Sequence, residues 1–115
     1  MTDAPADLMH SVLEVPEDHP AFAGHFPNFP VLPGAVLLDE ALKVIERERG
    51  IDLTQWQIAS AKFLDTVRPG DALRLEHAAT GNGVIRFTIL APERTVRGKD
   101  RTVASGSLSA PGFAP

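Results

Sequence analysis

The segment PGAVLLDEALKVIERERG, residues 33–50, decides the fold, because its apolar residues recur with the 3.6-residue period of an α-helix. The apolar face is formed by Val36, Leu37, Ala41, Val44 and Ile45, and the polar face by Glu40, Lys43, Glu46 and Arg47. Pro33 is favoured in a first helical turn and Gly50 just beyond a last one. We therefore predict a helix that Pro33 opens and that ends at Arg49. Leu38 widens the apolar face, so other elements are expected to cover this helix on several sides.

The sequence after this helix favours β-strands. Residues 55–64, 72–79, 84–90 and 101–109 are rich in β-branched and apolar residues, as strands are. Turn residues separate them, with Pro69-Gly70-Asp71 before the second and Gly81-Asn82-Gly83 before the third. We predict a tight hairpin at 81–83, a polar loop over residues 92–100 and a frayed tail after Ser109.

The sequence before the helix gives one more strand and a rigid loop. Residues 8–15 alternate as a half-buried strand does, whereas residues 16–33 contain five prolines and exclude a long helix or a central strand. Prolines at three-residue spacing also suit a polyproline-II ligand, but the apolar residues between them favour a packed loop. A single apolar helix needs the predicted antiparallel strands to cover it. We therefore expect one α+β domain over residues 1–115, with a sheet curled round one helix.

Composition narrows the class of protein. The 115 residues carry a net charge of −4, which argues against general nucleic-acid binding. The chain contains no cysteine, so it has no disulfide, no Cys-ligated zinc and no thiol nucleophile. No apolar run is long enough to span a bilayer, and the first residues lack the apolar core of a signal peptide, so we expect the cytoplasm. A chain this short buries a modest core, which makes an oligomer a reasonable expectation.

Three residues stand out as candidates for chemistry. His25 follows a glycine and precedes the proline-rich loop, and histidine is suited to proton transfer near pH 7. Asp39 interrupts an apolar stretch of the helix, where it lies either in a pocket or at the edge of the apolar stripe. Gly34 exposes the N–H groups at the helix start, which can bind a carbonyl oxygen or can simply reflect a tight junction. Packing, surface or turn roles are expected for His10, His19 and His77.

Basic residues gather near the C-terminus, at Arg94, Arg97, Lys99 and Arg101. Two interpretations stay open for this cluster. It is either a solvated loop or a docking edge for an acidic partner.

Two segments resemble a known family. AFAGHFPNFPVLPGAVLLDEAL, residues 21–42, resembles the active-site segment of the hot-dog-fold β-hydroxyacyl-acyl carrier protein dehydratases, with the same spacing from His25 to Asp39. KFLDTVRPGDALRLE, residues 62–76, resembles the strand–turn–strand of that family. In its short length and in the residues around His25, the chain most resembles the small stand-alone branch of that family. This branch includes dehydratases linked to aryl-polyene-type lipids.

The resemblance implies a hot-dog fold, in which a five-stranded antiparallel sheet wraps one long helix. It implies a cytoplasmic lyase of fatty-acid-like lipid biosynthesis that works as a homodimer or a larger assembly of dimers. Two chains would pair their sheets edge to edge, and His25 of one chain would face Asp39 of the other. The substrate would be a (3R)-3-hydroxyacyl group on the phosphopantetheine arm of acyl carrier protein, with no other cofactor and no metal.

The resemblance also implies roles for individual residues. His25 would take the C2 proton, and the Gly34 N–H would stabilise charge on the thioester oxygen. Asp39 would either protonate the leaving hydroxyl or, as a carboxylate, position a water for the reverse hydration. An apolar tunnel would be formed by Phe22, Phe26, Val36 and Leu37. The basic cluster would dock the carrier protein.

The sequence departs from the family pattern at several points. Lys43 stands where the family often has glutamine, and the chain contains no tyrosine to gate a tunnel. Two other functions therefore stay open. One is a hot-dog acyl thioesterase, against which the Gly24–Pro27 motif argues. The other is a non-catalytic acyl-binding partner subunit.

Overall fold

The computed structural model describes residues 7–15, 32–68, 70–96 and 99–112. One helix and five strands follow one another along the chain in the order β1 (Met9–Glu14), α1 (Gly34–Arg49), β2 (Gln57–Phe63), β3 (Ala72–Ala79), β4 (Val84–Val96) and β5 (Lys99–Ser109). The α+β class predicted from the sequence is confirmed. Among the described residues no helix is both long and apolar enough to cross a membrane.

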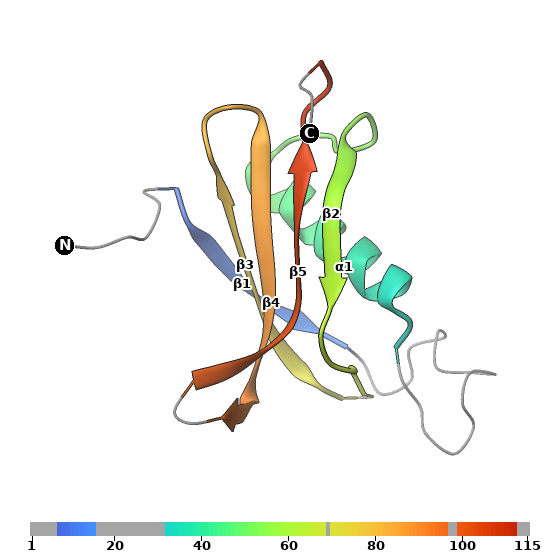
Figure 1. Cartoon of the computed structure of the whole chain (residues 1–115), viewed down its shortest axis with the longest axis vertical. Helices are drawn as coiled ribbons and strands as arrows, with labels where there is room; N and C mark the ends of the chain where they lie inside the picture. Colours follow the sequence, from blue (N-terminus) through green and yellow to red (C-terminus); the bar gives the residue numbers. More distant parts are fainter. Residues whose placement is uncertain (1–6, 16–31, 69, 97–98, 113–115) are drawn as a thin grey trace.

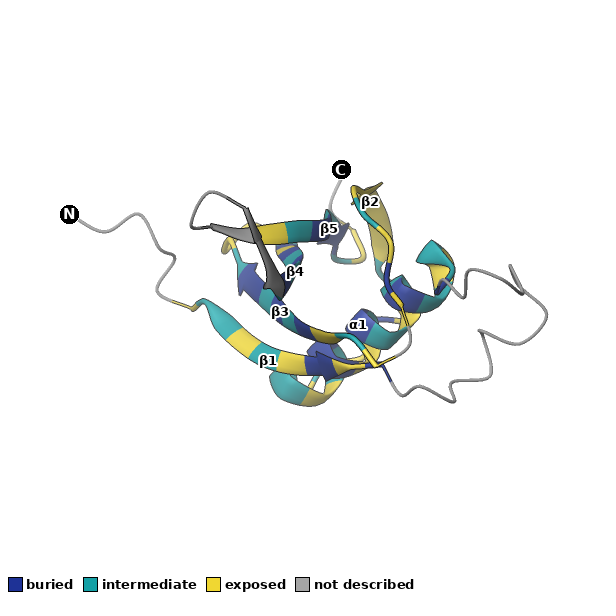
Figure 2. Cartoon of the chain, turned by 90° about the horizontal axis from the view of Figure 1, so that it is seen from below, coloured by how far each residue is buried: buried dark blue, intermediate teal, exposed yellow. Residues whose placement is uncertain are grey.

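The five strands form one antiparallel sheet in the order β1-β3-β4-β5-β2. β2 and β1 are therefore the two edge strands, although β2 follows α1 directly in the chain (Figure 1). The sheet curves, and α1 lies against its concave side (Figure 2). This arrangement confirms the prediction of a sheet curled round a single helix.

Helix α1 has the bounds that its apolar period predicts. Leu37, Ala41, Val44 and Ile45 are buried against the sheet. Gly50 ends the helix in the left-handed conformation, with φ of 64°, and its N–H bonds to the carbonyl of Glu46. Pro33 stands at the N-cap, one position before the first helical residue, and its carbonyl accepts the N–H groups of Val36 and Leu37.

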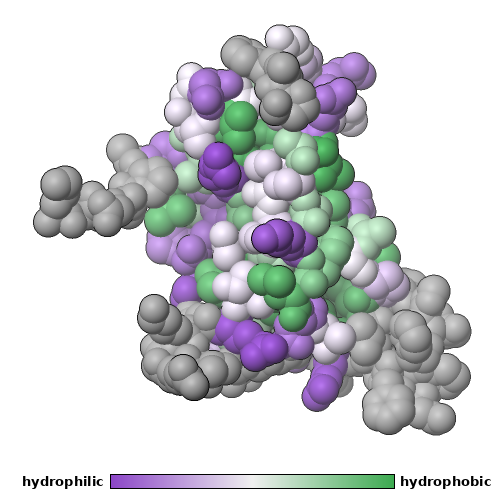
Figure 3. Space-filling view, viewed as in Figure 1, coloured by the Kyte–Doolittle hydropathy of each residue, from purple (hydrophilic) through white to green (hydrophobic). Residues whose placement is uncertain are grey.

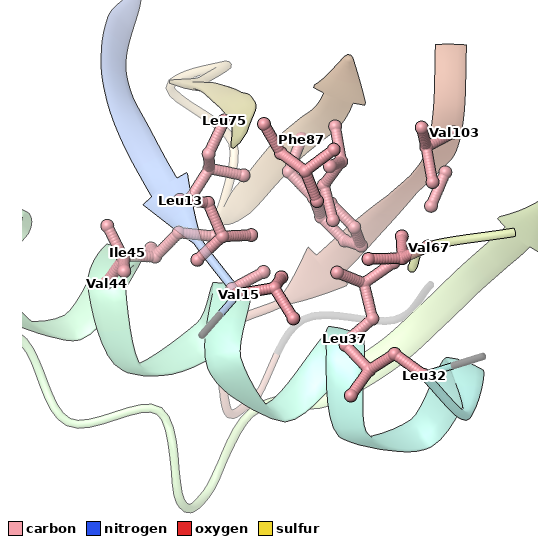
Figure 4. Packing of buried hydrophobic residues seen from close by; sticks show 14 of the residues in the cluster. Leu13, Val15, Leu32, Leu37, Val44, Ile45, Val67, Leu75, Phe87 and Val103 are labelled. Carbon is pink, nitrogen blue, oxygen red and sulfur yellow. The ribbon is translucent and has the colours of Figure 1, made fainter. Parts of the chain in front are cut away.

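The core lies between α1 and the concave face of the sheet. Leu37 projects from the first half of the helix towards Leu32 and Val67, and Phe87 points down from β4 (Figure 4). The other buried hydrophobic residues of this cluster are Leu13, Val15, Ala41, Val44, Ile45, Leu53, Leu73, Leu75, Ile85, Ile89, Ala91, Val103, Ala104 and Leu108. The alternation of β4 explains the pattern, since Ile85, Phe87, Ile89 and Ala91 all face the helix.

The glycines of the predicted turns adopt the positive φ angles that tight turns require. Gly81 and Gly83 both have positive φ angles, of 87° and 82°, and they join β3 to β4 in the predicted hairpin. Gly70 also has positive φ, of 80°, and its N–H bonds to the carbonyl of Val15. These turns align β3 with both of its neighbours.

The predicted polar loop over residues 92–100 is wrong. β4 continues to Val96, and β5 already begins at Lys99. Register shifts between Ile89 and Leu90, and again between Ala91 and Val96, interrupt the ladder beside Pro92. A bulge is where a strand tolerates a proline, so Pro92 bends this strand without ending it.

Candidate functional site

A cavity of about 490 Å³ opens at the first turn of α1. Two segments supply its walls, the start of the helix and the chain that follows β2. Its lining residues are Leu32, Pro33, Gly34, Leu37, Phe63, Leu64, Asp65, Thr66 and Val67. The cavity therefore combines apolar side chains with the donor end of a helix.

Gly34 lies at the base of this cavity, in close contact with Phe63. A β-carbon built on Gly34 would lie 3.0 to 3.1 Å from three atoms of the Phe63 ring. The absence of a side chain at position 34 is what lets the ring approach the helix start. The predicted position of Gly34 inside a binding site is thus consistent with the geometry.

The start of α1 can donate hydrogen bonds to a ligand. Among the described residues, no side chain forms a capping hydrogen bond at Pro33. The first N–H groups of the helix also carry the positive end of the helix dipole. A carbonyl or oxyanion placed in the cavity can therefore be stabilised there.

Asp39 lies one turn further along α1, on its exposed side. Its carboxylate forms an ion pair with Lys43, with 3.1 Å between Oδ2 and Nζ, and Lys43 also lies 3.7 Å from Glu40. The hydrogen bond that Lys43 donates to Asp39 and then the charge of Glu40 raise the pKa of Lys43. Asp39 does not line the cavity of its own chain. In the single chain Asp39 therefore lies at the surface, and its role in the site stays a prediction.

Two of the four predicted tunnel residues can be located. Leu37 is buried and lines the cavity, whereas Val36 is half-buried and packs against the core. Phe22, Phe26 and the predicted base His25 lie outside the described residues, so their roles stay predictions. The expected packed loop of residues 16–33 is described only from residue 32.

The predicted docking cluster can be located only at Arg101. This residue belongs to β5, is exposed, and donates from Nε to Oδ2 of Asp65 at 2.5 Å. Arg97 and the side chains of Arg94 and Lys99 fall outside the described part of the molecule. Asp65 lines the cavity, so Arg101 lies beside the cavity wall.

The site contains residues that the sequence reasoning missed. Phe63, Leu64, Asp65 and Thr66 form the second wall of the cavity. Their signal was present in the Lys62–Glu76 segment, where an apolar pair and polar residues precede the Pro-Gly-Asp turn. Because the segment was assigned to a strand and a turn, nothing indicated that it would face Gly34.

Strand β2 is exposed along its whole length, from Gln57 to Phe63. Its apolar residues Ile58 and Phe63 are about half exposed, as is Leu64 just beyond it. Figure 3 shows apolar residues on the side of the molecule where β2 lies in Figure 1. An unpaired edge with apolar side chains is typical of a surface that another strand covers.

Among the described residues no three acidic, histidine or cysteine side chains are grouped as a metal site. The start of α1 at Gly34 and the apolar side chains of the cavity supply polar stabilisation beside an apolar pocket. A carboxylate is available on the neighbouring helix turn.

Comparison with known proteins extends this picture. A family model described as "ApeI-like: ApeI dehydratase" matches residues 2–106. The chain is 34% identical over 112 residues to the 3-hydroxyacyl-acyl-carrier-protein dehydratase FabZ of Geobacter metallireducens, a match that covers 87% of this chain and 72% of that protein. It is 33% identical over 98 residues to the FabZ of Polynucleobacter asymbioticus, covering 76% of this chain.

Solved structures show the same fold. The structure titled "The Dehydratase Heterocomplex ApeI:P from Xenorhabdus doucetiae" superposes with a TM-score of 0.69 at 20% identity, covering 94% of this chain and 90% of that chain. An N-terminal dehydratase from the difficidin assembly line gives a TM-score of 0.72 at 15% identity, covering 97% and 41%.

The sheet wrapped round one helix, shared with these structures, is the hot-dog fold. Within that fold the chain belongs to the ApeI-like dehydratase family. The chain spans 64% of the Polynucleobacter FabZ and 44% of a FabZ from Chlamydia pneumoniae, so it matches only part of several of these relatives.

Proposed function

We propose that the chain dehydrates a (3R)-3-hydroxyacyl thioester to a trans-2-enoyl thioester and water. One observation carries the proposal. Gly34, at the start of α1, lines a cavity with mostly apolar walls, within a segment that the dehydratase family model matches. An acyl chain fits apolar walls, and a thioester oxygen fits the donors at Gly34.

The proposed reaction forms one carbon–carbon double bond and breaks two bonds. His25, in its neutral form, takes the proton from C2, and the electron pair of that bond forms the C2–C3 double bond. The bond between C3 and the hydroxyl oxygen breaks, and the hydroxyl leaves as water with a second proton. Hydrogen bonding at Gly34 stabilises the negative charge that develops on the thioester oxygen.

Asp39 has two possible parts in this step. As a carboxylic acid it supplies the proton of the leaving water. As a carboxylate it holds that water, and the proton comes from the imidazolium of His25.

The site is proposed to be completed by a second chain. Asp39 is exposed and does not line the cavity of its own chain, which fits a residue that serves a neighbouring site. The exposed edge of β2 supports a homodimer in which two β2 strands pair. The Xenorhabdus structure is a heterocomplex by its title, so pairing with a different chain is the outcome to test against a homodimer.

We propose that the acyl group arrives on the phosphopantetheine arm of acyl carrier protein. The relatives named as acyl-carrier-protein dehydratases support this partner. The basic residues Arg94, Arg97 and Lys99, which the sequence places close to one another, suit the docking of an acidic protein. The reaction needs no metal, so chelators are expected to leave the rate unchanged, and we place it in the cytoplasm.

Intact-mass measurement tests the activity. The purified chain is incubated with carrier protein bearing 3-hydroxyacyl or trans-2-enoyl groups. A loss or gain of about 18 Da on the carrier supports the dehydratase. Loss of the whole acyl group indicates a thioesterase instead. Unchanged mass with every chain length, despite acyl-carrier binding, indicates a non-catalytic partner subunit and contradicts the proposal.

Two variants assign the roles. His25→Ala is expected to abolish the mass change while the dimer persists, and unchanged turnover would show that another group is the base. Asp39→Asn keeps the size of the side chain and removes its charge. It is expected to lower turnover strongly with little loss of acyl-carrier binding. His10→Ala, at an exposed position of β1, is the control for histidine removal.

A further inference from the structure

Residues 64–67, which we call the site wall, connect the sheet to the cavity. Two backbone N–H groups of the wall, those of Leu64 and Asp65, bond to the carbonyl of Val103 in β5, at 2.7 and 3.2 Å. The side chain of Arg101, also in β5, donates to Asp65 at 2.5 Å. Strand β5 therefore fixes the first half of the wall through both backbone and side-chain bonds.

The other end of the wall holds the start of α1. The N–H of Leu32 bonds to the carbonyl of Val67 at 2.8 Å. Leu32 lies two residues before Gly34, and the ring of Phe63, just before the wall, packs on Gly34 itself. The donor groups at the helix start are therefore located relative to β5 by the wall.

The link between Arg101 and Asp65 is the side-chain part of this connection. Asp65 is mostly buried, with 22% of its side chain exposed, whereas Arg101 is 46% exposed. Oδ1 of Asp65 also accepts the N–H of Thr66 at 2.8 Å, so one carboxylate holds Arg101 and bends the wall backbone. The Arg101 guanidinium thus binds Asp65 from the solvent-exposed side of the site wall.

We propose that Arg101 is a positioning residue that acts through Asp65, holding the site wall and thereby the donor groups at Gly34 in their working geometry. The proposal rests on the proposed dehydratase function. It departs from the docking role that the sequence suggests for Arg101, because a guanidinium bonded to an internal carboxylate is already engaged.

Kinetics can distinguish the positioning role of Arg101 from a role in docking the carrier protein. A partly exposed ion pair contributes about 0–1 kcal/mol to stability, so variants of this pair are expected to fold. A small displacement of an oxyanion donor, in contrast, lowers the rate of the chemical step. A positioning role therefore lowers kcat with every substrate. A docking role raises KM with carrier-bound substrate alone.

The experiment compares Arg101→Gln and Asp65→Asn on carrier-bound substrate and on a short acyl thioester mimic. Both variants are expected to lower kcat by about three- to tenfold on both substrates, with unchanged dimer content. Arg86→Gln is the matched control, since Arg86 is an exposed arginine of β4 in the same sheet. It is expected to keep wild-type kinetics.

A charge-exchanged double variant, Asp65→Lys with Arg101→Glu, provides the rescue test. It restores a pair of opposite charges but removes the acceptor of the Thr66 N–H, so positioning predicts a kcat above that of Asp65→Lys or Arg101→Glu alone, without full recovery. It also leaves an acidic group where a docking arginine would be, so docking predicts a still higher KM for the carrier-bound substrate.

Three results would overturn the proposal. One is an effect of Arg101→Gln on KM with carrier-bound substrate alone. A second is a lower KM for Asp65→Asn, which would mean that Asp65 competes with the partner for Arg101. The third is wild-type kcat in both single variants. If the wild-type chain itself fails to dehydrate any substrate, the proposed function fails first, and this failure is distinct from an active wild type with unaffected variants.

Discussion

The Nε atom of Arg49 lies 2.8 Å from Nδ1 of His77, a histidine with only 1% of its surface exposed. A guanidinium can only donate, so Nδ1 is an acceptor and the proton of the neutral ring is on Nε2. That nitrogen lies 2.8 Å from Oε1 of Glu48, whose other oxygen accepts the hydroxyl of Ser11. The end of α1 is therefore joined to β1 and β3 by one connected set of polar contacts.

Replacing Glu48 tests the contribution of this set to stability. The Ser11 hydroxyl and then His77 lower the pKa of the Glu48 carboxyl. A folded-state pKa below the unfolded one stabilises the fold above about pH 4.3, and this contribution is lost as pH falls through the folded-state pKa. Glu48→Gln is thus expected to cost about 1–2 kcal/mol at pH 7 and to flatten the acid limb of the stability curve.

Urea denaturation at several pH values between 3 and 7 measures both effects. Glu14→Gln, at an exposed position of β1, removes an equivalent carboxylate without these partners and serves as the control. Equal stability of Glu48→Gln and wild type at pH 7, with parallel acid limbs, would show that the network contributes nothing.

Gly34→Ala tests the cavity at the start of α1. Alanine favours helix over glycine by about 1 kcal/mol, but its β-carbon would press on the Phe63 ring at about 3 Å and narrow the cavity. We expect near-unchanged thermal stability with at least tenfold lower turnover. Ala35→Gly, at the exposed next position, is the control for the helix start. Wild-type turnover in Gly34→Ala would show that Gly34 is not part of the active site.

Gly106→Ala tests a close approach inside the sheet. Its β-carbon would overlap the backbone oxygen of Ser60 and lie 2.6 Å from Cζ of the buried Phe87. Because the backbone of β2 cannot move without breaking the sheet, we expect a loss of about 3 kcal/mol or more. The neighbouring variant Ser107→Ala is expected to stay within 1 kcal/mol. Calorimetry of both variants measures the loss of stability. Equal melting temperatures would contradict the close contact of Gly106 with Ser60 and Phe87.

Ile58→Glu tests the assembly through β2. Ile58 is 50% exposed on one edge strand, and Val12 is 67% exposed on the opposite edge, which gives a matched pair. If β2 strands pair, two glutamates placed near a shared edge repel each other and lose apolar burial. Light scattering should then find Ile58→Glu as a monomer and Val12→Glu as a dimer. The reverse pattern would assign the interface to β1.

The sequence predicts the elements that depend on local signals. The 3.6-residue period and Gly50 define α1, and the glycines at 81 and 83 define the hairpin. The extension of β4 past Pro92 was missed, because a bulge that tolerates proline depends on the partner strand. The strand order, with β2 beside β5, is also non-local, and neither the pattern nor the resemblance predicted it.

The same division applies to the candidate site. Gly34 was named from its place at the start of a recognisable helix and Leu37 from the resemblance, and both line the cavity. Asp65 could not be predicted, since its importance comes from a contact with a residue 36 positions later. Asp39 was predicted as either pocket or surface, and the single chain places it at the surface. The position of His25 stays a prediction.

The pairing of β2 with β5 also has a consequence for synthesis on the ribosome. β5 is the only sheet neighbour of β2 in the described chain, and it is the last of the five described strands to be made. When β2 leaves the exit tunnel, neither of its edges has a partner within the chain. The helix can form early, but this strand must wait for some forty further residues, so nascent chains of neighbouring ribosomes meet with both edges of β2 uncovered.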